Sequence, residues 1–155
     1  MRVMDTEQPG GMWDVSDKTP TTRTALARAF LRMEPDTVAA VRNGTVPKGD
    51  PRPVAKVAAV MAAKNTPDLI PYCHPLALEH VRVEFAVGDE GIEVTVAVKT
   101  SAKTGVEMEA LVGASAAALT LYDMLKQLDM GMAIERVELV EKRGGKSDYA
   151  RVEGE

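Results

Sequence analysis

The longest apolar stretch of the sequence, residues 104–126, has the periodicity of an α-helix. Its apolar stripe comprises Val106, Met108, Leu111, Val112, Leu119, Leu121, Met124 and Leu125. The stretch contains no proline, and Thr104 followed three residues later by Glu107 has the spacing of a capping box, which predicts a helix start at Thr104. The middle, residues 113–118, has only small side chains, which allow close approach to a sheet or to a second helix.

Alternation of apolar and polar residues predicts the strands. The alternating apolar positions are Val81, Val83, Phe85 and Val87, followed by Ile92, Val94, Val96 and Val98. A glycine-bounded turn, residues 88–91, separates the two runs, so they form a hairpin. The apolar pattern of residues 134–140 predicts a last strand. Residues 22–33 lack a long apolar face and fit an edge strand or a helix, of which the strand is favoured.

Two shorter helices precede the hairpin. Pro35 opens the first and Gly44 closes it, the usual order of these residues at helix ends. Asp50 is expected to cap the second. The apolar face of this second helix comprises Val54, Val57, Ala58 and Met61. It must end near residue 65, because Pro67 follows, and residues 69–76 are then a loop held by two prolines.

The predicted order is strand, two helices, hairpin, long helix, strand. A hairpin cannot belong to an all-parallel sheet, so the class is α+β, an antiparallel sheet with helices packed on one face. The split β-α-β pattern of ferredoxin-like folds fits best. A length of 155 residues indicates one domain, expected over residues 12–147, with flexible tails at 1–11 and 148–155.

Composition restricts the partners and the compartment. A net charge of −4 argues against nucleic acid or an anionic membrane as the main partner. Cys73 is the only cysteine, so an internal disulfide is impossible and a reducing compartment fits. No apolar run is expected to have membrane-spanning length, and the N-terminus has no signal-peptide core. These features predict a soluble cytoplasmic domain.

Charged residues lie at both ends of the long helix and allow two interpretations. Glu107 and Glu109 can simply favour the positive end of the helix dipole, and Asp123 and Lys126 can be a surface pair at i, i+3 spacing. Alternatively, Asp123 and Lys126 are an acid and an amine that share a proton, as general acid–base chemistry requires. The spacing alone does not decide between the two.

Residues 73–74, Cys-His, suggest thiol chemistry or a metal site, and both have objections. Neighbouring residues of an extended chain point to opposite sides, so Cys73 and His74 make a poor dyad. One cysteine with His74 and His80 does not match the closely spaced ligand pairs of zinc sites, so no metal is expected. His74 fits equally well as a loop histidine fixed by Pro75.

The segment Gly-Gly-Lys-Ser at residues 144–147 looks like the end of a phosphate loop. The complete motif requires a glycine where this sequence has Val140, so the motif fails. Two glycines remain that expose backbone N–H groups beside Lys142, Arg143 and Lys146. The segment can hold a phosphate or be a solvated tail.

Together, these pieces resemble one family. The matching segments are WDVSDKTPTTR, PKGD, MAAKNTPDLIPYCHPL, TGVEMEAL, YDMLKQLDMGM and EKRGGKS, which are similar to the MoaC family, the cyclic pyranopterin monophosphate synthases of molybdenum cofactor biosynthesis. The resemblance covers residues 12–147 in the same order and spacing. The sequence departs from the common pattern at Trp13, Tyr72, Leu125 and Asp148, and only Tyr72 falls in a substrate loop.

The resemblance implies a substrate, 3′,8-cyclo-7,8-dihydro-GTP, and its rearrangement to a pyranopterin with closure of a cyclic phosphate and release of pyrophosphate. It implies Asp123 as acid/base with Lys126 as its partner, and no cofactor. Substrate-contact positions are Tyr72, Cys73, His74, Met108 and Glu109; candidate triphosphate ligands are Lys48, Lys64, Lys142 and Lys146; Asp14, Arg23 and Glu107 match active-site positions without an assigned role. It also implies a hexamer built from dimers, with sites at the dimer interface.

Helix geometry independently raises the question of a shared site. Glu109 and Asp123 are fourteen residues apart on one predicted helix, which corresponds to about 21 Å along its axis. Their directions differ by only about 40° at 3.6 residues per turn, so they share a face but lie at opposite ends. Two such helices, antiparallel across a two-fold axis, would bring Glu109 of one chain beside Asp123 of the other.

Two other functions remain open on the sequence. A non-catalytic ferredoxin-like nucleotide sensor could use the same basic loops. A lysine enzyme could use Lys126 as a nucleophile that forms a Schiff base with a carbonyl substrate. Pyrophosphate release separates an enzyme from a sensor, and borohydride trapping of an adduct identifies a Schiff base.

Overall fold

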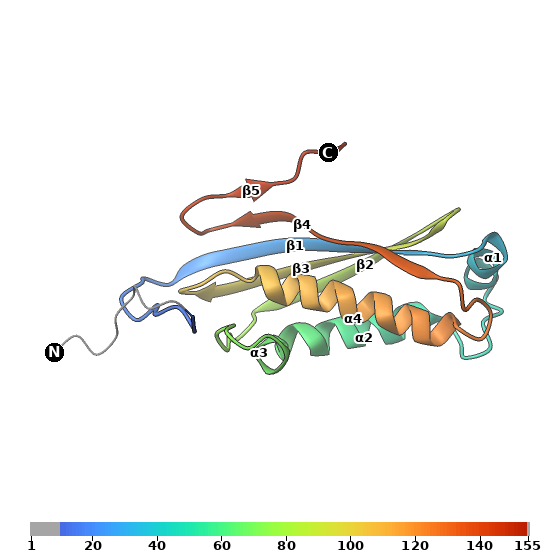
Figure 1. The fold of residues 1–155 in the computed structure, drawn as a ribbon, viewed down its shortest axis with the longest axis horizontal. Coiled ribbons are helices and arrows are strands. Elements are labelled where there is room, and N and C mark those ends of the chain that lie inside the picture. Colours follow the sequence, from blue (N-terminus) through green and yellow to red (C-terminus); the bar gives the residue numbers. More distant parts are fainter. Residues whose placement is uncertain (1–9, 155) are drawn as a thin grey trace.

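The computed structural model of the protein describes residues 10–154. The predicted N-terminal tail, residues 1–11, therefore lies outside the described residues except for Gly10 and Gly11. In chain order the elements are β1 (Thr21–Arg32), α1 (Pro35–Asn43), α2 (Pro51–Lys64), α3 (Thr66–Leu69), β2 (His80–Gly88), β3 (Gly91–Ala102), α4 (Glu107–Leu125), β4 (Ala133–Arg143) and β5 (Tyr149–Ala150). Figure 1 shows the long helices beneath a single sheet.

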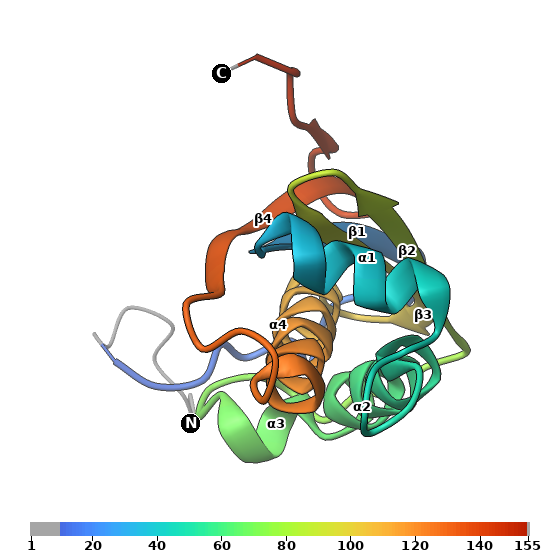
Figure 2. The ribbon, with the colours of Figure 1, turned by 90° about the vertical axis from the view of Figure 1, so that its right-hand side faces the viewer.

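The strands form one antiparallel sheet in the order β2-β3-β1-β4-β5. Helices α2 and α4 lie side by side on one face of this sheet (Figures 1 and 2). The connectivity through β4, with strand order β2-β3-β1-β4, is that of the split β-α-β arrangement. The predicted α+β class is therefore confirmed.

Strand β1 is central, whereas the sequence suggested an edge. It pairs with β3 on one side and with β4 on the other. Its buried face consists of Ala25, Ala27, Ala29 and Leu31, which face Val98, Val96, Val94 and Ile92 of β3. Three alanines give a weak alternation signal, but they leave room for α4 to pack closely on the middle of the sheet.

The predicted helix ends are correct for the two shorter helices, and for α4 only the predicted start is wrong. Gly44 follows α1 in the left-handed conformation, and Asp50 accepts a hydrogen bond from the Arg52 backbone N–H at 3.0 Å at the start of α2. Helix α4 instead begins at Glu107 without a side-chain cap, so the predicted capping box with Thr104 is absent. The Glu107 carboxylate lies against Gly105 and contacts Lys142.

The small side chains of α4 serve packing within the same domain. The buried face of α4 includes Ala110, Ala114, Ala117 and Ala118, which pack against the sheet and α2. A Cβ added to Gly113 would lie 3.2 Å from both the Ala59 carbonyl oxygen and Val96 Cγ1. Of the two explanations for residues 113–118, packing inside the domain is therefore the one that the structure supports.

The predicted apolar face of α2 is wrong. Val54, Val57 and Met61 are exposed, Val57 by 58% of its surface, and the helix buries Ala55, Ala59 and Ala63 instead. Only small residues permit the close contact with Gly113 of α4, so the alanine face turns inward. The larger apolar residues consequently form part of the outer surface of the chain.

Helix α4 is the one helix among residues 10–154 that is long and apolar enough to cross a membrane, contrary to the expectation that no such run exists. Half of that apolar window is buried inside the domain. Leu121 and Leu125 are fully covered by the rest of the fold. The core helix of a globular domain is buried in the same way.

Part of the predicted C-terminal tail is paired with the sheet. Strand β5 adds to β4, with Tyr149 opposite Lys142. Beyond it, the Arg151 backbone N–H donates to the Val140 carbonyl at 2.8 Å, and Glu153 accepts from Arg28 at 3.0 Å. The expected tail thus covers the outer edge of β4 and reaches back to β1.

Candidate active site

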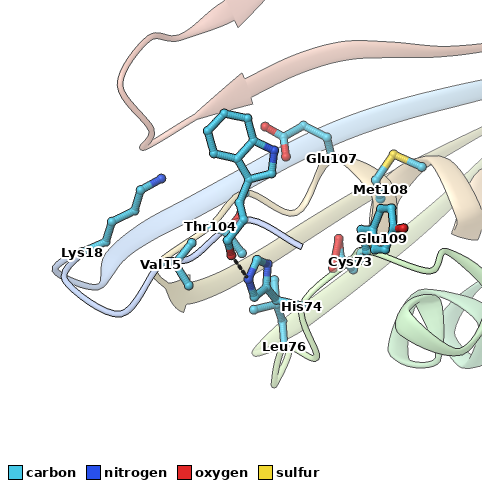
Figure 3. A pocket seen from close by; sticks show the side chains of 12 residues that line it. Val15, Lys18, Cys73, His74, Leu76, Thr104, Glu107, Met108 and Glu109 are labelled. Carbon is cyan, nitrogen blue, oxygen red and sulfur yellow. Dashed lines mark hydrogen bonds between the residues drawn. The ribbon is translucent and has the colours of Figure 1, made fainter. Parts of the chain in front are cut away.

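A pocket of about 300 Å³ opens at the N-terminal end of α4 (Figure 3). Three segments that are distant in sequence meet there: the chain before β1, the proline-held loop before β2, and the start of α4. The lining residues are Trp13, Val15, Lys18, Tyr72, Cys73, His74, Leu76, Thr104, Gly105, Glu107, Met108 and Glu109. The five residues that were predicted to contact substrate therefore all line one pocket: Tyr72, Cys73, His74, Met108 and Glu109.

Glu109 is the most unusual of these side chains, because it is a carboxylate with only 3% of its surface exposed. Burial raises its pKa above the ordinary value, and the neighbouring charge of Glu107 raises it further. A group of this kind can accept hydrogen bonds from N–H donors of a ligand while water is largely excluded.

The pair Cys73–His74 does not form a catalytic dyad. Burial raises the pKa of the Cys73 thiol, and Glu109 and Glu107 add to the shift, so the thiol stays protonated at neutral pH. His74 Nε2 instead donates to the Trp13 carbonyl at 2.8 Å. His74 therefore links the proline-held loop to the segment before β1, consistent with the objection raised from the sequence.

Basic residues from the start of β1 and the end of β4 lie beside this pocket. Lys142 Nζ lies 3.3 Å from Glu107 Oε1, so the end of β4 is next to the start of α4. Gly144 has φ of 95°, and a Cβ there would lie 1.9 Å from the Thr22 carbonyl oxygen, so only glycine lets this turn lie on β1. Within residues 10–154, Arg23 Nε is buried without a hydrogen-bond partner, while Arg23 Nη2 donates to the Lys103 carbonyl at 3.3 Å.

A second group of charges lies at the other end of α4. Lys126 Nζ is 2.8 Å from Asp123 Oδ1, and Lys48 Nζ is 3.7 Å from Asp123 Oδ2. The hydrogen bond from Lys126 lowers the pKa of Asp123, with further contributions from the charges of Lys126 and Lys48. The same bond raises the pKa of Lys126. At neutral pH this group holds a carboxylate between two ammonium ions.

The structure thus separates the predicted site into two clusters. The first contains Tyr72, Cys73, His74, Glu107, Met108, Glu109 and Lys142, and the second contains Lys48, Asp123 and Lys126. They lie at opposite ends of α4, the helix that Figure 1 draws in yellow to orange. The fourteen residues from Glu109 to Asp123 correspond to about 21 Å along the helix axis.

Four predicted residues belong to neither cluster. Lys64 ends α2, and Lys146 lies in the turn after β4; both are exposed and neither lines the pocket. Asp14 accepts from the Ser16 backbone N–H at 2.9 Å, and its pKa is lowered by the hydrogen bonds from Ser16. Arg23 lies under the turn of Gly144, next to the pocket and outside its lining.

Sequence reasoning included Asp14 of the segment before β1 but missed the residues of this segment that line the pocket. Trp13, Val15 and Lys18 line the pocket, and Lys103 Nζ donates to the Ser16 carbonyl at 3.1 Å to hold this segment against β3. Lys18 belongs to the matched block at residues 13–23, and this membership is the signal that could have singled it out.

Comparison with known proteins identifies the group to which this sequence belongs. The family model described as MoaC family matches residues 12–145, most of the chain. The chain belongs to the MoaC family. A curated relative from Novosphingobium aromaticivorans, named cyclic pyranopterin monophosphate synthase, is 55% identical over 136 residues, which is 88% of this chain and 87% of the relative. The residues matched to the MoaC family include both clusters at the ends of α4.

The buried carboxylate leads to a prediction about stability. Between the ordinary pKa of a glutamate and the raised pKa of Glu109, the unfolded chain has released a proton that the folded chain still holds. Stability therefore falls as pH rises through this window. We expect the melting temperature of Glu109→Gln to increase relative to that of the wild type as pH rises from about 4 to about 7.

Thermal unfolding at several pH values measures this difference. Glu79→Gln is the matched control, because Glu79 is exposed and the same substitution there removes no buried charge. A difference between Glu109→Gln and wild type that is constant over this pH range would show that Glu109 ionises as an ordinary surface glutamate does.

Proposed function

We propose that this protein is a cyclic pyranopterin monophosphate synthase, which converts 3′,8-cyclo-7,8-dihydro-GTP to cyclic pyranopterin monophosphate and releases pyrophosphate in molybdenum cofactor biosynthesis. Family membership supports this activity. The structural observation that carries it is the contact of 2.8 Å between Lys126 and Asp123, with Lys48 also beside Asp123. The protein is proposed to work in the cytoplasm and without a cofactor.

The two residues have opposite protonation states, as acid–base chemistry requires. Asp123 is a carboxylate with a lowered pKa, and Lys126 is an ammonium with a raised pKa. Opening and reclosing the purine and ribose rings requires repeated proton transfers, with Asp123 as the base and Lys126 as the acid in the resting protein. The raised pKa disfavours the Schiff-base alternative, because a nucleophilic lysine needs its amine neutral.

Binding of the ring system is assigned to the first cluster. The guanine-like ring of the substrate presents N–H donors, and Glu109 is a buried acceptor in the pocket. Glu107 lies between Glu109 and Lys142, so its carboxylate connects the ring-binding pocket to the basic side. His74 holds the loop that carries Tyr72 and Cys73.

The triphosphate is assigned to the basic residues around these clusters, with Lys48 and Lys146 as leading candidates and Lys64 and Lys142 as further ones. Lys48→Ala and Lys146→Ala should each weaken binding of a non-hydrolysable GTP analogue by about tenfold, since hydrogen bonds to charged groups contribute about 1.5–3 kcal/mol. Affinity of the wild type should fall as salt rises, because the contacts are solvent-accessible.

Titrations at several salt concentrations test this assignment. Lys56→Ala is the matched control, because Lys56 is an exposed lysine in the middle of α2 and outside both clusters. An affinity for the analogue that does not change with salt would refute electrostatic capture of the triphosphate.

The distance between the clusters supports a site shared by two chains. Glu109 and Asp123 lie about 21 Å apart along α4, so a substrate held at Glu109 is out of reach of Asp123 in the same chain. Antiparallel pairing of two copies would complete each site. Exposed apolar residues on the helical layer, such as Leu119 at 60%, Val57 and Met61, offer surface for such a contact. The proposed assembly is a hexamer made of three such dimers.

Incubation with the cyclised dihydro-GTP tests the function against its two rivals. A synthase releases pyrophosphate and forms a pterin, whereas a nucleotide sensor binds the compound and returns it unchanged. Borohydride added during turnover reduces a Schiff base to a stable adduct on Lys126, so an adduct would favour the lysine enzyme. We expect pyrophosphate and pterin and no adduct.

A further inference from the structure

Two large aromatic side chains line the pocket of Glu109, and both are mostly uncovered. Trp13 exposes 81% of its surface and Tyr72 exposes 63%. Trp13 is the only tryptophan of the chain. Most aromatic side chains of this size lose much of their surface to the fold, so two uncovered ones at one pocket present apolar area to a ligand.

The backbones that carry these side chains are fixed although the rings are free. The Trp13 carbonyl accepts from His74 Nε2 at 2.8 Å, and the Ser16 carbonyl accepts from Lys103 Nζ at 3.1 Å. On the other segment, the Cys73 backbone N–H donates to the Ile70 carbonyl at 3.1 Å. His74 therefore joins the segment of Trp13 directly to the loop of Tyr72, and both rings are attached to anchored backbone at the pocket rim.

The pocket thus combines aromatic surface with buried carboxylate. A planar heterocycle with N–H groups at its edge matches both features, because its face stacks on aromatic rings while its edge donates to a carboxylate. A phosphate chain matches neither the apolar area nor the acceptor, because it presents charged oxygens and no N–H donor. Glu109 and Glu107 repel phosphate where they line the pocket, whereas Lys18 on the lining and Lys142 beside Glu107 are positively charged.

We propose that Trp13 and Tyr72 are positioning residues that stack on the fused ring system of the substrate and hold its plane while Glu109 accepts from its edge. This inference rests on the proposed function for the identity of the ring. It assigns a binding role to Trp13, which contributes both an aromatic face and the carbonyl that anchors His74. Neither aromatic residue takes part in proton transfer.

The fluorescence of the sole tryptophan tests the stacking directly. We expect GTP to quench the emission of Trp13 saturably, and inorganic tripolyphosphate to bind without quenching. In calorimetric titrations, which do not depend on Trp13 emission, Trp13→Leu and Tyr72→Leu should each weaken GTP binding by about tenfold, the effect of losing one stacking partner, and leave tripolyphosphate binding nearly unchanged. Trp13→Phe and Tyr72→Phe should restore most of the GTP affinity. Tyr149→Leu, at an exposed tyrosine of β5, is the matched control.

The outcomes separate this inference from the function on which it rests. If the Leu variants bind GTP as the wild type does, while the wild type still makes pterin and pyrophosphate, the stacking role is wrong and the function stands. If GTP quenches Trp13 but the wild type releases no pyrophosphate from the cyclised substrate, stacking stands and the function is wrong. Equal losses of GTP and tripolyphosphate affinity, with a change in oligomer mass, would instead place the two rings in an interface between copies and overturn the proposal.

Discussion

Asp123→Asn and Lys126→Ala each lower turnover by about a hundredfold or more, the usual contribution of a positioned acid or base. Asparagine keeps the shape of the carboxylate but cannot take a proton, and alanine removes the ammonium that contacts it at 2.8 Å. Both side chains are exposed, so the fold should remain intact and the melting temperature should change little. Steady-state kinetics and circular dichroism of the purified variants measure the two effects.

A matched control is available in the turn between β2 and β3. Asp89 is exposed and pairs with Arg42 at 3.2 Å, so Asp89→Asn removes a comparable surface ion pair away from both clusters. Turnover of this variant should equal that of the wild type. Near-normal turnover in Asp123→Asn or Lys126→Ala would mean that their ion pair is structural and that the acid–base assignment is wrong.

Mixing two inactive variants restores activity if the site is shared. Glu109→Ala and Asp123→Asn chains are unfolded, combined in equal amounts and refolded together. In a mixed dimer, one site receives Glu109 from one chain and Asp123 from the other, and is intact, whereas the second site lacks both. Random association makes half of the dimers mixed, so roughly a quarter of wild-type activity should return.

Two controls make the complementation decisive. Refolding each variant alone must give no activity, and a mixture of Asp123→Asn with Lys126→Ala should also stay inactive, because both residues belong to the same cluster on one chain. Mass spectrometry of the intact assemblies establishes that mixed oligomers form. If the mixture of Glu109→Ala and Asp123→Asn stays inactive although mixed oligomers are present, each site lies within one chain.

The fold class followed from the sequence because alternation and helical periodicity are local signals. The hairpin of β2 and β3 and the core helix α4 are strongly patterned, and they determine the α+β arrangement. The central place of β1 and the inner face of α2 were missed for a common reason. Both surfaces are built from alanine, which a hydrophobic pattern ranks below valine or methionine. Alanine is required there because α2, α4 and the sheet lie too close together for larger side chains.

The candidate site was predictable where its residues lie in compact motifs. The residues of the CHPL and GVEMEA segments do line one pocket, and Asp123 and Lys126 do form the expected pair. The contribution of Trp13 and Lys18 depends on a contact across sixty-one positions, the hydrogen bond between Trp13 and His74, which no local pattern indicates. The capping box failed because α4 begins at Glu107 itself, and the Glu107 carboxylate pairs with Lys142, which only the folded chain brings near.

Phosphorus NMR of the reaction mixture tests the central claim most directly. The protein is incubated with 3′,8-cyclo-7,8-dihydro-GTP, and the phosphorus signals are followed together with pterin absorbance. The account predicts that the triphosphate signals disappear while free pyrophosphate and one cyclic phosphate diester appear in equal amounts, in step with the pterin. Triphosphate signals that persist unchanged in the presence of folded, oligomeric wild-type protein would contradict the proposed synthase activity.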